Sequence, residues 1–420
     1  MEKIFFESLR KSTKAKKILK IFLCSFLGLY VFSIPSFSGR ESFNYLYYAI
    51  FIILVILLVL YKKIYSSFNF TLKHFIPFFF STSSLVGTIL YSHAFREWAT
   101  IFLISFSFFI MVTLFDEINN KRLILYIIYG ALLCFSVYFC LRYKKQLFNF
   151  TSISSLRLGD YFDNVNAVSM YFTLGLGISL FLALFYKKRI ELLNILSSAL
   201  FFWLGSTTGS RTFIITLFLL TILLVIMRFK RNKILLFTIL GCLICLLFLL
   251  INLPFMNTIK IRMLDMIRTI FGGTEIEGST IQRRIMQDYG FFLGIKNMFF
   301  GLGAHGFATF SGVGTYSHSN FSEVFCNFGL LGFISFYSIW YICFLNSSKV
   351  KDDYKLFAIS FLIVELIHSF FAVLFSSKIS AFELALFIYL CCPKNLAYKP
   401  SFINISSKSN PIEMYFEIRI

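Results

Sequence analysis

Charged and turn-forming residues are scarce in this sequence. Only 14% of its 420 residues are charged and 6 are proline, whereas 58% are hydrophobic. This composition excludes the soluble globular classes. Apolar stretches of about 20 residues, the length that crosses a bilayer core, recur along most of the chain. We therefore predict an all-α polytopic integral membrane protein.

Twelve apolar segments are candidates for membrane spans, separated by short turns rich in Lys and Arg. We expect transmembrane helices 1–9 within residues 1–253, a large external loop at 254–320, helices 10–12 within 321–393 and a cytoplasmic tail at 394–420. The basic N-terminus has no small-residue cleavage site, so we expect the first helix to be retained. The expected spans are 18–37, 44–61, 75–92, 97–115, 123–141, 164–186, 191–208, 211–228, 234–253, 321–346, 354–374 and 379–393.

The distribution of basic residues predicts the orientation, because Lys and Arg are translocated unfavourably. It favours cytoplasmic N- and C-termini, so the net charge of +20 is mostly a topology signal and we expect no nucleic-acid partner. The external loops 142–163 and 254–320 break the trend, and Arg outnumbers Lys on that side. Because Arg binds phosphate or carboxylate bidentately, we predict an anionic ligand there. Contact with membrane lipid headgroups is the alternative.

Cysteine is lacking from the predicted external loops. All nine cysteines fall within apolar segments, where they act as small buried hydrophobes rather than disulfides. Cys242 and Cys245 form a C-x-x-C pattern in mid-helix without a second pair, so we predict no metal or redox site. The external loops also lack an Asp-x-Asp triplet, the usual clamp for a metal–nucleotide donor. The sequence therefore predicts no metal and no cofactor.

One polar hairpin interrupts two apolar runs, "FWLGSTTGSRTFII" at residues 202–215. Arg211 should enter the first turn of the eighth helix at membrane depth, where a cation normally faces a protein-lined or water-filled cavity. The free amides of a helix start also favour an anion. We interpret this turn as a candidate phosphate site.

The loop at 254–320 is long enough to form a lid or small external domain. Its part at 256–271 is amphipathic, as in a helix that lies on a membrane surface. Ser279 or Thr280 should cap a further helix that runs to about Leu293. That helix would carry Arg283 and Arg284 in its first turns, about 100° apart, so only one can face a site. The glycines that follow predict a flexible connector, at positions 301, 303, 306, 312 and 314.

A polar patch closes this loop in "GTYSHSNFSEVFCNFGLLGF", residues 314–333. His318 is a candidate base, with Asn320 and Glu323 beside it at the entrance of the next helix. Tyr316 is a candidate for stacking on a sugar ring, as are Tyr161 and Tyr289. His305 is the rival to His318. Further along, Glu365 and His368 lie one turn apart and, with Glu383, could line a lipid-carrier cavity or form a structural cluster.

Three of these stretches resemble, in order, landmarks of the O-antigen ligase and polymerase superfamily, the Wzy-type polysaccharide polymerases and their ligase relatives. They are "RLGDYFDNVNAVSMYF" (157–172), "LGSTTGSRTFI" (204–214) and the region 278–336, which ends in a G-x-G connector and "HSNFSE" ahead of "GLLG". Relatives often read His-Asn directly, whereas Ser319 intervenes here. The resemblance covers about residues 150–340.

The resemblance implies a GT-C-like membrane glycosyltransferase of the bacterial plasma (inner) membrane, with its site on the external side. Its substrate would be a polyprenyl-pyrophosphate-linked oligosaccharide, with a chain-length regulator and a flippase as partners. Arg211 would bind the donor pyrophosphate, helped by Arg284 or Arg283 and by Arg157. His318 would activate the acceptor hydroxyl, and Asn320 and Glu323 would orient it or the sugars.

The reaction predicted in this way is a metal-independent, inverting transfer that polymerises O-antigen or capsular repeat units. Fixed guanidinium groups can stabilise a pyrophosphate leaving group, and a histidine is a suitable base near neutral pH. A ligase that transfers the glycan to a lipid core or protein is the alternative within the enzyme class. A flippase for lipid-linked sugars is the alternative outside it, but we find no internal repeat of the kind transporters often show.

Overall fold

The structure is a computed structural model, and the secondary-structure elements of its described part are all helices. It describes residues 13–37, 44–65, 70–147, 158–159, 161–162, 165–186, 191–250, 252, 257, 260–261, 263–264, 268, 278–347 and 352–392. The predicted amphipathic stretch at 256–271 and the tail at 394–420 lie largely or wholly outside these ranges. The prediction of an all-α fold is confirmed.

Each of the twelve predicted apolar segments contains a helix. Among the described residues, eight helices are long and apolar enough to cross a membrane, so the chain is a multi-pass membrane protein: α2 (Thr13–Phe37), α3 (Asn44–Tyr65), α4 (Leu72–Gly87) with its π-helical extension η1 (Thr88–Ser92), α5 (Phe95–Ile118), α6 (Lys121–Arg142), α8 (Val165–Phe185), α10 (Arg211–Phe229) and α15 (Asn320–Ser347). The remaining helices are α7 (Lys144–Leu147), α9 (Glu191–Thr207), α11 (Lys233–Leu250), α13 (Gly278–Lys296), α14 (Gly306–Phe310), α16 (Asp353–His368) and α17 (Lys378–Cys391).

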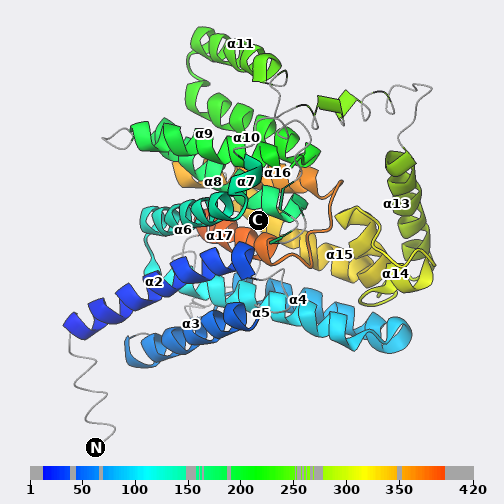
Figure 1. Ribbon diagram of the computed structural model, residues 1–420. Coiled ribbons are helices and arrows are strands. Elements are labelled where there is room, and N and C mark those ends of the chain that lie inside the picture. The colour runs from blue at the N-terminus through cyan, green and yellow to red at the C-terminus, as the bar shows by residue number, and fades with distance from the viewer. Residues whose placement is uncertain are drawn as a thin grey trace, which may run out of the picture.

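Helix α17 occupies the centre of the bundle (Figure 1). Every residue from Ile379 to Cys391 is buried, in keeping with a helix that is apolar on all sides. Its 14 residues are fewer than a membrane span requires. The chain before α17 therefore lies inside the bundle as a loop, and this loop becomes part of the wall of a cavity.

Buried ion pairs fasten one end of the bundle. Lys62 of α3 pairs with Glu117 (2.7 Å) and Lys73 of α4 pairs with Asp116 (2.8 Å), so both helices are tied to the C-terminal turn of α5. The Nζ of Lys73 also donates to the carbonyl of Cys392 after α17 (3.1 Å). Buried charges need such partners. The pairs lie at the C-terminal end of α5, whereas Glu97, at the N-terminal end of α5, lines a cavity.

Helix α15 is broken at Gly329, whose backbone angles (φ 61°, ψ −164°) are not helical. A break leaves amide and carbonyl groups without intrahelical partners, and a lipid environment offers none. The chain before α14 supplies them: the amide of Leu330 donates to the carbonyl of Met298 (2.6 Å), and the amide of Gly303 donates to the carbonyl of Asn327 (2.6 Å). The connector is thereby attached to α15 at its break.

The glycine connector, predicted to be flexible, is tightly packed in its first part and open in its second part. A Cβ at Gly301 or Gly303 would overlap neighbouring backbone, of α15 and of Thr88 respectively, so these positions are tightly packed. At Gly312 and Gly314 a Cβ would meet nothing within 4 Å. The prediction is therefore wrong for the first part of the connector, because that part completes the backbone hydrogen bonding of α15.

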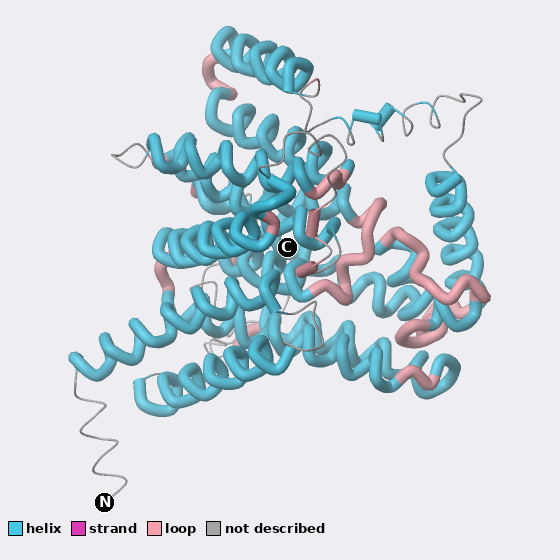
Figure 2. The backbone as a smooth tube through the Cα atoms, viewed as in Figure 1, coloured by secondary structure: helices cyan, strands magenta, loops and turns pink. Residues whose placement is uncertain are grey.

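Two other boundaries differ from the predictions. Helix α16 ends at His368, not at 374, because the buried side-chain oxygen of Asn320 accepts hydrogen bonds from the amides of Leu374 (2.8 Å) and Phe375 (3.0 Å) and holds that stretch as a loop. Helix α13 begins at Gly278, before the predicted cap at Ser279 or Thr280. Figure 2 shows the loops around α14 and the loop between α16 and α17 on the same side of the bundle.

The packing at the connector predicts unequal effects for two glycine-to-alanine changes. Gly303 (φ 86°) and Gly312 (φ 71°) both adopt left-handed backbone angles, so Gly303→Ala and Gly312→Ala share a strain of about 1–2 kcal/mol. Only Gly303→Ala adds overlap, which typically costs about 1–3 kcal/mol more. We expect a clearly lower Tm for Gly303→Ala than for Gly312→Ala in detergent. Equal melting temperatures would contradict this account of the connector.

Candidate functional site

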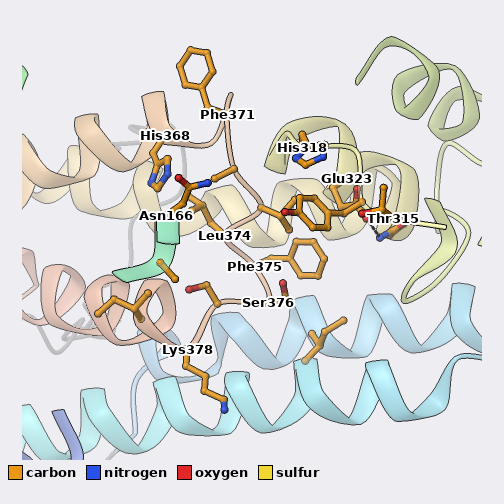
Figure 3. Close-up of a pocket in the computed structure, with 18 of the residues that line it drawn as sticks. Asn166, Thr315, His318, Glu323, His368, Phe371, Leu374, Phe375, Ser376 and Lys378 are labelled. Carbon is orange, nitrogen blue, oxygen red and sulfur yellow. Dashed lines mark hydrogen bonds between the residues drawn. The ribbon is translucent and has the colours of Figure 1, made fainter. Parts of the chain in front are cut away.

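A cavity of about 740 Å³ lies where the loops before α15 and α17 meet α5 and α8. Its wall combines residues far apart in the sequence, several of which are labelled in Figure 3. Its polar members come from α5, α8, α13, the α14–α15 region, α16 and the start of α17: Glu97, Thr100, Asn166, Arg283, His305, Thr315, Tyr316, His318, Glu323, Asn327, His368, Ser376, Ser377 and Lys378. Four predicted site residues are among them, namely Arg283, Tyr316, His318 and Glu323.

His318 is held in an unusual backbone conformation just before α15. Its φ of 62° lies in the left-handed region, which is uncommon outside glycine. The preceding amide, of Ser317, donates to Oε2 of Glu323 (2.6 Å). The hydroxyl of Ser317 also contacts that of Ser322 (2.8 Å). These bonds fix the turn so that the half-buried imidazole lines the cavity beside the ring of Tyr316, with centroids 4.4 Å apart.

The surroundings of His318 favour its uncharged form. Burial lowers the pKa of His318 below its ordinary value of 6.5, and the positive charge of Arg283 lowers the pKa further. An imidazole with such a pKa is mostly free of its second proton at neutral pH. It can therefore accept a proton from a hydroxyl group in the cavity.

Glu323 supports this turn from inside the protein. Its side chain is 4% exposed, and its Oε1 accepts a hydrogen bond from Nδ2 of Asn327 (3.0 Å). Asn327 in turn accepts from the amide of Phe307 in α14 (2.7 Å). The carboxylate thus connects the His318 turn, α15 and α14, and its position indicates a role in holding His318 in place.

The two neighbouring arginines of α13 differ in their surroundings. Arg283 is half-buried, lines the cavity and acts electrostatically on His318. Arg284 is exposed and does not line the cavity. Of the two alternatives that the sequence leaves open, the geometry favours Arg283 as the one that faces the candidate site.

Arg211 begins α10, as predicted, but it is not a lining residue of the cavity. The hydroxyl of Ser210, just before it, donates to Oδ1 of Asn166 (3.0 Å), and Asn166 does line the cavity. The amide of Leu158 donates to the carbonyl of Thr207 in the same turn (3.0 Å). The first two sequence landmarks therefore meet at the cavity edge, although Arg157 itself lies outside the described residues.

Asn320 does not line the cavity. Its side chain is fully buried, and besides accepting from the 374–375 amides it donates from Nδ2 to the hydroxyl of Tyr337 (2.9 Å). Its own amide donates to the carbonyl of Ser369 (2.8 Å). The geometry therefore indicates that Asn320 fixes the loop between α16 and α17 against α15. That loop forms one wall of the cavity.

Sequence reasoning missed one wall of the cavity. The loop at 371–377 and Lys378 line it, yet "FFAVLFSSK" is apolar enough to be taken as the end of a span. Only the hydrogen bonds from its amides to Asn320, which is distant in sequence, show that this stretch is a loop. Asn166 gave a weak signal, since it lies inside the first landmark. In the described part of the chain, no group of three or more His, Cys, Asp or Glu side chains is arranged to hold a metal ion.

Comparison with known proteins supports the resemblance for the second and third landmarks, whereas the first, at 157–172, lies outside the match. The family model described as O-antigen ligase matches residues 195–337, about a third of the chain. The match includes the Arg211 turn, α13 and the His318 turn. No curated protein matches the chain. The chain is thus a multi-pass membrane protein, and its residues 195–337 are similar to the O-antigen ligase family.

Proposed function

We propose that this protein polymerises lipid-linked oligosaccharide repeat units, of O-antigen or capsule type, at the external side of the bacterial plasma membrane. It transfers the growing glycan from polyprenyl pyrophosphate to a sugar hydroxyl of a new lipid-linked unit. The observation that carries the proposal is the meeting of His318, Arg283 and Tyr316 in one cavity, next to the turn that contains Arg211.

The residues of the cavity suit the chemistry of such a transfer. Breaking the bond between sugar and pyrophosphate leaves negative charge on the leaving group, and fixed guanidinium groups stabilise it. Arg283 supplies one at the cavity wall, and Arg211 stands at the N-terminus of α10, where free amides also favour an anion. These two cations are our candidates for binding the pyrophosphate.

His318 is our candidate for the general base. Its uncharged imidazole accepts the proton of the acceptor hydroxyl as that oxygen attacks the anomeric carbon and the pyrophosphate leaves. One displacement of this kind inverts the configuration at the anomeric carbon. The chain's own charged groups carry the mechanism, so we propose that it needs no metal ion. The ring of Tyr316, beside His318, is placed to stack on a sugar.

A ligase is the second candidate, because the matching family model is described as O-antigen ligase and covers both activities. The two activities share the donor and differ in the acceptor, which for a ligase is a completed lipid core or a protein. The cavity residues serve either acceptor equally well. A chain-length regulator and a flippase are partners that the polymerase would require in the cell.

Replacement of His318, the proposed base, distinguishes a polymerase from a ligase. In cells whose only copy of the protein carries His318→Ala, a polymerase defect leaves the surface acceptor with single repeat units, whereas a ligase defect leaves polymer on the lipid carrier. We expect the first pattern, read from the glycan ladder of the envelope on gels. An unchanged ladder at normal protein level would remove His318 from the mechanism.

The adjacent arginines give a matched pair of variants. Arg283→Gln removes a guanidinium from the cavity, and loss of one such stabilising donor typically slows transfer by about 100-fold or more. Arg284→Gln removes the same group from an exposed position, so we expect transfer within about twofold of the unmodified protein. Purified enzyme with lipid-linked oligosaccharide provides the measurement. The opposite result would assign the site to Arg284.

The pH dependence of transfer tests the electrostatic link between Arg283 and His318. Because the active imidazole is uncharged, kcat/KM should be constant near neutral pH and fall as pH drops through the His318 pKa, which lies below 6.5. Arg283→Gln removes a charge that lowers this pKa, so the decline should move to higher pH. Arg283→Lys keeps the charge and should leave the decline of kcat/KM at the same pH. An acid limb unaffected by either change would contradict the link.

A further inference from the structure

A second histidine lines the cavity, far along the sequence from His318. His368 is the last residue of α16, and its side chain is only 3% exposed. Its Nε2 has no hydrogen-bond partner among the described residues. A buried polar atom without a partner typically costs about 1–3 kcal/mol, and native proteins contain few of them. Such a nitrogen at a cavity wall indicates a partner that is bound there.

Two buried carboxyl groups belong to the same part of the bundle. Glu365 lies one turn before His368 on α16, and Glu383 lies on the neighbouring helix α17; both side chains are buried. Each glutamate also has an Oε2 atom without a partner in the described part of the chain. Ionisable residues inside a membrane protein are costly and are usually kept for function.

Helices α16 and α17 also pack against each other through apolar side chains. The rings of Phe361 on α16 and Phe387 on α17 stack 5.2 Å apart. Burying a charge in such surroundings is costly, so we take the imidazole of His368 as uncharged. An uncharged imidazole has one N–H donor and one acceptor nitrogen, and rotation about its Cβ–Cγ bond can present either to the cavity. A phosphate offers acceptors and prefers cations, whereas a hydroxyl group both donates and accepts.

His368 of α16 and Asn166 of α8 both line the cavity (Figure 3). Asn166 accepts a hydrogen bond from Ser210, beside the Arg211 turn. Arg283 and His318 bring a cation and a basic group to the cavity, Asn166 and His368 bring neutral polar groups, and Glu97 and Lys378 also line it. The neutral donors and acceptors of Asn166 and His368 suit the hydroxyl groups of a sugar.

We propose that His368 binds a sugar hydroxyl of the lipid-linked glycan, and that the buried carboxyl groups of Glu365 and Glu383 belong to the support of α16 and α17. This inference rests on the proposed function and names the part of the cavity that recognises sugar rather than pyrophosphate. His368 is a binding residue in this scheme, separate from the base at His318.

The contribution of His368 to binding is measured by comparing the affinities of the protein for two lipids. One is undecaprenyl pyrophosphate without sugar, and the other is the lipid-linked oligosaccharide extracted from cells that lack this protein. Their affinities for the purified full-length protein follow from ligand-induced shifts in Tm. We expect His368→Phe, which removes the donor and acceptor but fills the space, to weaken binding of the oligosaccharide by about tenfold, the loss typical of one hydrogen bond to a buried polar group. Binding of the sugar-free lipid should change less than twofold.

Controls separate the inference from the proposal it rests on. His368→Gln keeps a donor and an acceptor, so it should retain most of the affinity for the oligosaccharide. This variant still tests the inference if His368→Phe folds poorly. If the unmodified protein binds neither lipid, the proposed function fails. If it prefers the oligosaccharide and both variants keep that preference, only the inference on His368 is overturned. Equal weakening of both lipids would likewise overturn it, because His368 would then act on the cavity as a whole.

Discussion

The break in α15 at Gly329 determines the arrangement of the site. A helix in lipid needs a partner for every backbone polar group, so a broken helix is stable only where protein supplies the missing hydrogen bonds. Here the connector before α14 supplies them, through pairs such as Leu330 with Met298 and Gly303 with Asn327. Because the connector is bound to α15 at this point, the chain must return to the start of α15 over a short path. That path carries the His318 turn into the cavity.

Buried polar side chains at the start of α15 then orient the walls. Glu323 accepts the Ser317 amide and so shapes the turn that presents His318. Asn320 accepts the amides of Leu374 and Phe375 and so holds the loop before α17. Neither side chain needs to contact a substrate to be indispensable, since each satisfies backbone groups that would otherwise be buried without partners. The first turn of one helix thus holds two parts of the cavity lining in place.

The cavity combines charged and neutral polar groups. Arg283 lowers the pKa of the His318 imidazole, so in the proposed mechanism the cation that attracts a pyrophosphate also keeps the proposed base ready to accept a proton. Asn166 and His368 add neutral donors and acceptors to the lining. The proposed glycosyl transfer uses both kinds of group, one for the charged leaving group and one for the sugars.

The sequence by itself determined the membrane class, the helical segments, the Arg211 helix start and the importance of the region 278–336, because hydropathy and local turn chemistry are properties of short stretches. It left open which of Arg283 and Arg284 faces the cavity, since both lie on one helix and only the packing of α13 chooses between them. It missed the loop at 371–377 and misread Gly301 and Gly303 as flexible. These features depend on hydrogen bonds and contacts with Asn320, Thr88 and the break in α15, which are remote in sequence, and only the tertiary structure brings them together.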